Sequence, residues 1–409
     1  MFAKECRAVL KSIIYAAFLA VIVLFYTTQL GDYAGNDIKQ YKTLTEELNE
    51  PLSDNPFIRP VPGQDSYGYR SAEIPEQVMP NAAARLISER NSNKFISYKT
   101  GFYREIKLSE KQLSEIDKLI EQMTGLSVRD ISSTEAISFK VSYEEFKENM
   151  RLIDKIIGGG SYYDPEGLRQ YGQRALSYEE KLTEYDSFIN QDRITGAYAR
   201  LFCDYMGIVI ALFSVFVPVS FLLRDRRAKM TELIYARKKS AAGIVLTRYA
   251  ALVCMTIMPF LLLSLIPAAQ LSLFASQNGM SADYSAFLKY IAGWLLPSVL
   301  ASSAVAYFFT ALTDTPIAIL LQFVWSIRGI MTGVHSFEGG RYGTEMAIRH
   351  NSLGSLYLVQ ENIDALITNR LSYAGVSVIF ITAAIVVYNQ KRRGKLNGFD
   401  GFKKTVRNR

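Results

Sequence analysis

The sequence contains few of the residues that catalytic and metal sites use. Its 409 residues include three cysteines, Cys6, Cys203 and Cys254, and two histidines, His335 and His350. Neither histidine has a cysteine or a second histidine at the spacing of a zinc site. The sequence also lacks the motifs G-x-S-x-G, H-E-x-x-H and G-x-x-x-x-G-K-[ST]. We therefore expect a chain that is not an enzyme and that has no catalytic, cofactor-binding or metal-binding residues of its own.

The composition lies between those of soluble proteins and of simple membrane-spanning bundles. Hydrophobic residues make up 49% of the chain and charged residues 21%. The first fraction is high for a soluble protein of this length, and the second is high for a chain that consists of membrane spans alone. We expect one part of the chain to lie in lipid and another part in water.

Six largely uncharged runs are long enough to cross a membrane, because a span needs roughly 20 apolar residues to cover about 30 Å of hydrocarbon. An arginine interrupts the fifth run. We therefore predict an all-α polytopic membrane protein with six transmembrane helices, together with a mainly helical extracytoplasmic domain. The six predicted spans cover residues 12–30, 205–223, 249–275, 290–312, 316–334 and 371–388.

The first run has an alternative interpretation as a secretory signal peptide. Lys4, Arg7 and Lys11 precede it, as basic residues precede the apolar region of such peptides. Its 19 uncharged residues exceed the usual apolar length of about 7–15 residues, and no clean small-x-small cleavage site follows. We favour a retained span.

Three basic segments indicate the orientation of the chain. Residues 1–11, 224–248 and 389–409 carry net charges of +2, +6 and +7, whereas the whole chain carries +7. Because Lys and Arg collect on the cytoplasmic side of membrane proteins, we predict a multi-pass membrane protein with both termini in the cytoplasm. The positive charge then reflects topology, and we expect no nucleic-acid partner.

The same topology places residues 31–204 outside the cytoplasm as one large domain, with a second outer loop at 336–370. The domain has no disulfide framework, because Cys6 and Cys254 lie outside it and its single cysteine, Cys203, lies beside the second predicted span. We predict helices after three Ser-x-x-Glu/Gln capping boxes, and glycines at 158–160 end the second of these helices. The capping boxes are Ser109 with Gln112, Ser142 with Glu145, and Ser177 with Glu180.

The predicted cytoplasmic segment 224–248 contains apolar residues among its basic ones. With the start of the next span it reads RDRRAKMTELIYARKKSAAGIVLTRYAAL. On a helical wheel Met230, Leu233 and Ile234 share one face, and Glu232 lies roughly opposite. A loop that only fixed topology and contacted anionic headgroups would need neither the apolar triplet nor Glu232. We therefore favour a docking helix over a basic loop.

This segment resembles the cytoplasmic segment of ABC-2-type exporter permeases. In that family an acidic residue, two apolar residues, a small residue and a later basic residue lead back into the membrane. The matching positions here are Glu232, Leu233, Ile234, Ser240 and Arg248. The plan of six spans with both ends inside is also similar, and the large domain after the first span resembles a subgroup of bacterial permeases with such an insertion.

The resemblance implies that the segment is a coupling helix in a cleft of a separate ABC ATPase subunit, which would hold ATP and Mg. It also implies a second permease chain, as a homo- or heterodimer, within the lipid of a bacterial cytoplasmic membrane. We expect the permease subunit of an ATP-driven exporter. The alternative is a membrane subunit that relays force or signal to its extracytoplasmic domain without solute transport. The expected coupling residues are Met230, Glu232, Leu233, Ile234 and Arg237.

Two polar residues of the fifth predicted span are candidates for the transport path. Arg328 is costly in hydrocarbon and is therefore a candidate functional residue, although snorkelling to the interface or a helix break explains it equally well. Gln322 lies on the same helix, and its simpler explanation is a single hydrogen bond between helices. The sequence leaves both alternatives open.

Overall fold

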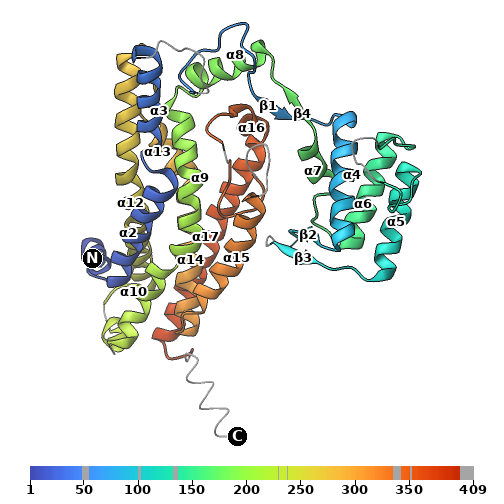
Figure 1. The fold of residues 1–409 in the computed structure, drawn as a ribbon. Helices are drawn as coiled ribbons and strands as arrows, with labels where there is room; N and C mark the ends of the chain where they lie inside the picture. Colours follow the sequence, from blue (N-terminus) through green and yellow to red (C-terminus); the bar gives the residue numbers. More distant parts are fainter. Residues whose placement is uncertain are drawn as a thin grey trace. The chain divides into compact units, whose positions relative to one another are not determined.

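The computed structural model of the chain describes residues 1–47, 55–99, 103–131, 137–228, 230–236, 238–334, 342–350 and 352–396. These residues form two compact units (Figure 1). The first unit contains the N-terminal residues up to 59, residues 183–334 and the C-terminal part of the chain, and the second consists mainly of residues 60–182.

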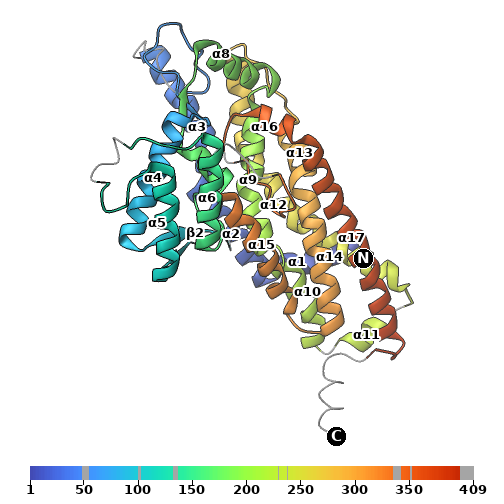
Figure 2. The ribbon, with the colours of Figure 1, turned by 90° about the vertical axis from the view of Figure 1, so that its right-hand side faces the viewer.

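The first unit is a helical bundle with five stretches that are long and apolar enough to cross a membrane, at Ile13–Thr45, Thr195–Arg227, Ala241–Gln277, Ala286–Thr313 and Ile363–Arg392. Their main helices run side by side in both views (Figures 1 and 2). The stretches contain α2 (Ile13–Phe25), a π-helical turn (Tyr26–Leu30) and α3 (Tyr33–Lys42); α9 (Thr195–Phe213) and α10 (Phe216–Arg227); α12 (Ala241–Gln277); α13 (Ala286–Tyr290), a π-helical turn (Ile291–Leu295) and α14 (Leu296–Thr313); and α17 (Ile363–Arg392).

Shorter elements complete this unit. They are α1 (Phe2–Leu10), α11 (Thr231–Tyr235), α15 (Ile317–Val334), α16 (Leu356–Glu361) and the π-helical turns Thr43–Glu47 and Ser187–Gln191. Many large apolar side chains on the bundle point outward, including Ile13, Val378 and Ile379, which are 82%, 63% and 66% exposed. Such a surface is stable against lipid and not in water. The chain thus has the features of a multi-pass membrane protein.

The bundle is held together where small side chains allow close approach of helices. The most extensive helix contact joins α14 to α17. On α14, the consecutive residues Ala301, Ser302, Ser303 and Ala304 are fully buried. Small residues at a helix interface let the backbones approach closely, which increases van der Waals contact where lipid provides no hydrophobic driving force.

The helices are longer than the uncharged runs that predicted them. α9 begins at Thr195, ten residues before the predicted start at 205, and residues 195–204 are all buried. Arg200 and Asp204 lie within this first part of α9 and interrupt the apolar pattern. The fifth predicted span corresponds to α15 (Ile317–Val334), whose described apolar part, Ile317–Ile327, is shorter than the five long stretches.

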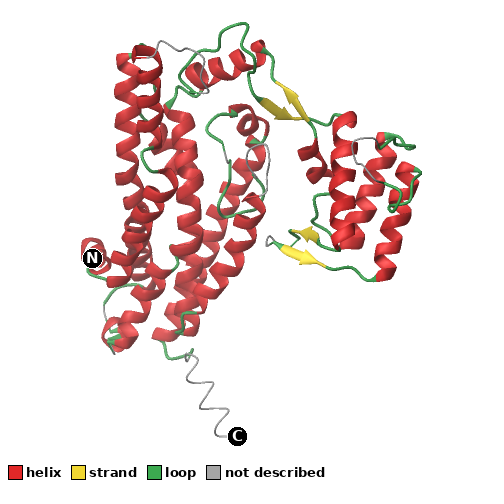
Figure 3. Ribbon diagram, in the orientation of Figure 1, coloured by secondary structure: helices red, strands yellow, loops and turns green. Residues whose placement is uncertain are grey.

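The second unit combines helices with two short two-stranded antiparallel sheets (Figure 3). Strand β1 pairs with β4, with Tyr69 opposite Ala175, and β2 pairs with β3, with Phe95 opposite Ile106. The elements are β1 (Tyr69–Ser71), α4 (Pro75–Ser92), β2 (Phe95–Ser97), β3 (Arg104–Ile106), α5 (Glu110–Thr124), α6 (Tyr143–Ile157), α7 (Pro165–Leu168), a 3₁₀ turn (Arg169–Tyr171), β4 (Gln173–Ala175) and the start of α8 (Tyr178–Asp186).

Local sequence signals correctly predicted α5, α6 and α8, whereas α4 and α7 were not predicted. All three capping boxes form, because each serine accepts a hydrogen bond from the backbone of the third residue of its helix and that residue's side chain accepts one in return. Gly158 ends α6 with a φ of +113°, a conformation that favours glycine. The apolar faces of α4, α5 and α6 form one core around Leu86, Ile116, Phe146 and Ile153.

The domain predicted for residues 31–204 is larger than the second unit. Residues up to 59 and from 183 onward belong to the helical bundle. In particular, α3 continues the first span after a break at Gly31 and Asp32, and Phe57 packs in the bundle core. The sequence shows where hydrophobic runs end, but not that the polar helices beyond them pack against the same bundle.

Candidate functional site

The predicted coupling segment forms a short helix between two long ones. α10 ends at Arg227, α11 covers Thr231–Tyr235, and α12 begins at Ala241. Ser240 caps α12, because its Oγ accepts a hydrogen bond of 3.1 Å from the Gly243 N–H. The residues from 241 onward, predicted to be part of the cytoplasmic segment, therefore already belong to the long helix.

The side chains of α11 do not form the single apolar face that the helical wheel predicts. Leu233 is 66% exposed and Met230 43%, whereas Ile234 is only 4% exposed and packs in the bundle core. Consecutive helical residues differ by about 100° around the axis, so Leu233 and Ile234 point to different sides. Glu232 is exposed. The surface available to a partner thus contains Met230, Glu232 and Leu233, and Arg237 lies outside the described residues.

A buried ion-pair network lies directly behind this segment. Arg248 on α12 is 6% exposed. Its Nη2 lies 2.7 Å from Asp225 Oδ2 on α10, and its Nε lies 3.6 Å from Glu5 Oε1 on α1. The network therefore joins three helices. Sequence reasoning identified Arg248 as a motif position but gave Asp225 and Glu5 no role beyond topology.

A narrow pocket lies where α11 meets α10, α12, α14 and α17. Tyr235 of α11 lines the pocket and packs edge-to-face on Tyr388 of α17, with ring centroids 5.2 Å apart. On another side, Lys391 Nζ lies 2.6 Å from Asp314 Oδ2. Because Arg248 also lines the pocket, a displacement of α11 would change the packing around the charges that join the helices.

A second cluster of polar residues lies inside the bundle, around residues 342–350. This segment is irregular, yet Met346, Ala347 and Ile348 are at most 2% exposed. Part of the loop predicted at 336–370 to lie outside the membrane is therefore enclosed by helices. Irregular backbone is stable in such a place only when other groups satisfy its carbonyls.

Polar side chains from the surrounding helices satisfy these carbonyls. The Ser298 Oγ donates a 2.7 Å hydrogen bond to the Met346 carbonyl, the Tyr373 hydroxyl a 3.0 Å bond to the Thr344 carbonyl, and the Arg370 Nη2 a 3.2 Å bond to the Glu345 carbonyl. Of the three donors, Ser298 lies on α14, and Arg370 and Tyr373 lie on α17. They fix the inserted segment to two helices.

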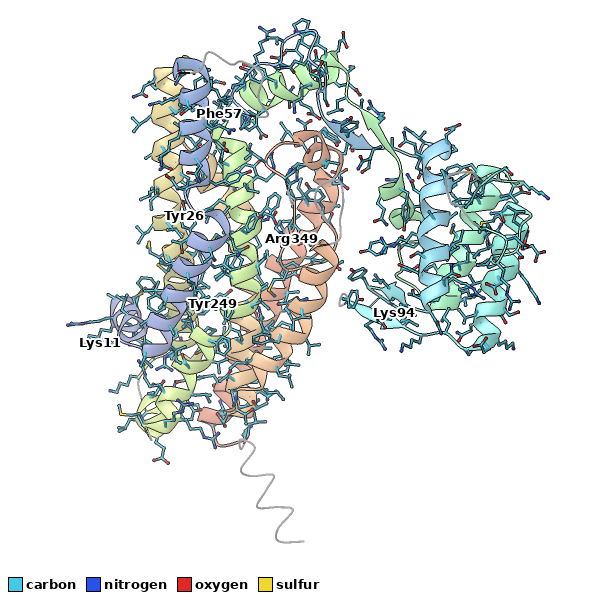
Figure 4. The ribbon with its side chains drawn as sticks, viewed as in Figure 1. Lys11, Tyr26, Phe57, Lys94, Tyr249 and Arg349 are labelled. Atoms are coloured by element: carbon cyan, nitrogen blue, oxygen red, sulfur yellow. The ribbon has the colours of Figure 1, made fainter. Side chains whose placement is uncertain are left out.

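Buried charges in the same region are paired. Arg349 Nε lies 2.6 Å from Asp204 Oδ1, and Arg200 Nη2 lies 2.6 Å from Asp192 Oδ2. Figure 4 shows Arg349 among the helices of the first unit. The His350 Nε2 donates a hydrogen bond to the Gly354 carbonyl at 2.7 Å. Pairing is expected, because an isolated buried charge is strongly unfavourable.

Of the two candidate transport-path residues, the structure describes the side chain of Gln322 but not that of Arg328. Gln322 is 1% exposed, and its Nε2 donates a 2.8 Å hydrogen bond to the Ala211 carbonyl on α9. This is the hydrogen bond between helices that the simpler explanation predicts. Arg328 lies on α15, but its side chain is outside the described part of the chain. The role of either residue in a transport path stays a prediction.

Among the described residues, no group of three or more His, Cys, Asp or Glu side chains is placed to hold a metal ion. Comparison with known proteins gives no relative: no family model matches this sequence, and no curated protein or solved structure matches it. The functional interpretation therefore rests on the residues and their geometry.

Proposed function

We propose that this chain is the permease subunit of an ATP-driven ABC exporter in a bacterial cytoplasmic membrane. It crosses the membrane six times, with α15 as the fifth span, and both termini and α11 face the cytoplasm. A separate ATPase subunit hydrolyses ATP, and a second permease chain completes the transporter. The second unit is then the extracytoplasmic domain.

One observation carries the proposal: α11 exposes Met230, Glu232 and Leu233 while its other side contacts the ends of the long helices. Ile234 is buried in the bundle, and Tyr235 packs on α17. A partner that moved the exposed side would therefore displace the helix ends directly. A loop that only fixed the topology would need neither the exposed apolar side nor the contacts with the long helices.

The test is co-purification of the tagged chain with the proposed ABC ATPase subunit from the cells that produce it, together with ATP hydrolysis by the complex. Leu233→Asp should lower ATPase affinity by more than tenfold, because burying leucine contributes about 1.5–3 kcal/mol and a desolvated carboxylate costs several more. Glu232→Lys should also weaken the contact by adding a like charge to a basic segment. Leu126→Asp is the matched control, since Leu126 is an exposed leucine of the second unit.

Both variants should insert normally, because neither residue contributes to the described core. If Leu233→Asp and Glu232→Lys retain the ATPase and its activity as fully as Leu126→Asp does, the coupling proposal is wrong. The segment would then serve topology alone.

A relay subunit that moves no solute is the second candidate. The compact core of the second unit favours it, because a domain with its own packed core can receive and transmit a movement. ATP-dependent conformational change in the second unit without ATP-dependent movement of any solute into inverted vesicles would support this alternative over export.

A further inference from the structure

The first helix of the chain, α1, lies across the direction of the long helices (Figure 2). Its main contacts are with α12. Two of its residues are buried against the bundle, Val9 at 1% and Glu5 at 7% exposed. Glu5 Oε1 lies 3.6 Å from Arg248 Nε, so one side of α1 is fixed to the bundle.

Three observations place α1 at the boundary of the hydrocarbon. It ends directly before the first uncharged run, which begins at Ser12. The Arg224 Nη1 donates a 3.3 Å hydrogen bond to the Ala8 carbonyl, and Arg224 is the first charged residue after the second uncharged run. Arg248, the partner of Glu5, is the last charged residue before the third run. Since such runs lie in hydrocarbon, α1 lies where three of them end, at the level of the lipid headgroups.

The rest of α1 has a basic side and an apolar side. The basic side consists of Lys4, Arg7 and Lys11, which are exposed and fall within about 60° of one another at about 100° per residue. Leu10, which is 56% exposed, lies on the wheel between this basic side and the buried Val9. Lys11 is at the outer edge of the first unit (Figure 4). A helix with these sides is suited to lie in the membrane interface, with its apolar side among acyl chains.

The basic side has no counter-charge of its own. Within the ranges that the structure describes, no acidic side chain forms an ion pair with Lys4, Arg7 or Lys11. Glu5, the acidic residue of α1, points to the bundle and pairs with Arg248. The surroundings add another cation, because Lys239 Nζ lies 3.6 Å from Met1 Sδ at the start of the helix. An anionic partner at this level would therefore meet charge of one sign.

We propose that α1 binds the headgroups of anionic phospholipids, with its basic side at the phosphates and Leu10 among the acyl chains. Apolar contact favours any phospholipid, and each basic residue near the surface adds attraction for an anionic one. A soluble acidic protein would satisfy the charges but leave the apolar side in water, so lipid is the occupant that fits both sides. The proposal requires a membrane-spanning bundle and is independent of transport and of an ATPase partner.

The first experiment compares the binding of phosphatidylglycerol and phosphatidylcholine, with the same acyl chains, to the purified full-length chain. Native mass spectrometry of the protein released from maltoside micelles gives both affinities. The wild type should bind phosphatidylglycerol at least tenfold more tightly. The α1 variant, with Lys4→Gln, Arg7→Gln and Lys11→Gln, should lose this preference, because each basic residue near an anionic surface contributes roughly fivefold in affinity. Its affinity for phosphatidylcholine should stay unchanged.

The matched control removes three other exposed cations, with Lys238→Gln, Arg393→Gln and Lys395→Gln. These residues lie at the same end of the long helices, because the Arg392 Nη1 at the end of α17 donates a 2.6 Å hydrogen bond to the Lys239 carbonyl before α12. The control has the net charge of the α1 variant but retains the basic side of α1. It should keep the lipid preference within threefold of the wild type. An equal loss in both variants would show an attraction spread over this end of the protein and would contradict a site on α1.

The second experiment locates the lipid by amide hydrogen exchange in nanodiscs of phosphatidylglycerol or phosphatidylcholine. In the wild type, α1 should exchange more slowly in phosphatidylglycerol, because bound headgroups restrict its opening; in the α1 variant the two nanodiscs should give equal rates. The proposal is wrong if the wild type shows neither the affinity difference nor the difference in exchange. It is also wrong if the α1 variant keeps the lipid preference but loses a soluble protein that co-purifies with the wild type, since the basic side would then bind protein.

Discussion

Replacing Arg248 with methionine should destabilise the helical bundle more than the loss of an ordinary ion pair does. The arginine is 6% exposed and lies between Asp225 at 2.7 Å and Glu5 at 3.6 Å. The side chains of Asp225 and Glu5 are themselves only 16% and 10% exposed. Arg248→Met therefore removes the cation that Glu5 and Asp225 share and leaves both carboxylates with little solvent. Arg224 Nη2 still lies 3.7 Å from Asp225 Oδ1, but its side chain is 45% exposed.

The expected cost is about 3–5 kcal/mol, the usual effect of removing one partner from a buried ion pair. For a unit of roughly 280 residues, with an unfolding entropy of about 2.1 cal/mol/K per residue, this corresponds to a decrease in melting temperature of about 5–8 °C. Tryptophan fluorescence during heating measures the effect, because both tryptophans of the chain, Trp294 and Trp325, lie in this unit.

Two further variants test the reasoning. Lys289→Met removes a cation that is 67% exposed from its pair with Asp283, and such an exposed pair should contribute only about 0–1 kcal/mol. Adding Glu5→Gln and Asp225→Asn to Arg248→Met removes all charge from the network and should restore part of the lost melting temperature. A decrease for Arg248→Met no larger than that for Lys289→Met would refute the argument.

Three other expectations concern topology and the second unit. On intact cells, a cysteine at Gln64 should react with an impermeant thiol reagent and one at Lys239 should not; the reverse pattern would overturn the orientation. Gly160→Ala should cost about 1–3 kcal/mol, because φ is +72° and the new Cβ would meet backbone atoms, measurable as faster amide exchange in α6 than in the wild type. Hydrogen bonds from Arg174 lower the pKa of Glu180 to about 2. Its stabilising effect should therefore be present above the ordinary carboxyl pKa and decrease as pH falls toward 2, seen as faster amide exchange in α8; a Glu180→Gln variant that kept the same pH dependence would contradict this.

Local features of the fold could be predicted from the sequence because they depend on neighbouring residues. A capping box such as that of Ser142 and Glu145 needs two side chains three positions apart and the helix between them. The long apolar stretches are equally local, since the bilayer thickness sets their length. The structure confirms both the predominantly helical fold and five stretches long enough to span a membrane.

The candidate site was only partly predictable. The helical wheel assigned Ile234 to a partner surface, but α11 has only five residues and its neighbours in space decide which side is covered. The enclosed segment at 342–350 has no sequence signal of its own, because its stability depends on donors such as Ser298 and Arg370 from distant helices. A polar loop in water would have the same sequence pattern.

The sequence by itself determined which stretches avoid water and where the three capped helices α5, α6 and α8 begin. Hydrophobicity and capping act over a few residues and need no knowledge of the rest of the chain. Only the tertiary structure decided that Arg248 meets Glu5, more than two hundred positions away, and that Arg349 meets Asp204. The physical reason is that a buried charge is stable only beside its partner, and helix packing alone brings such partners together.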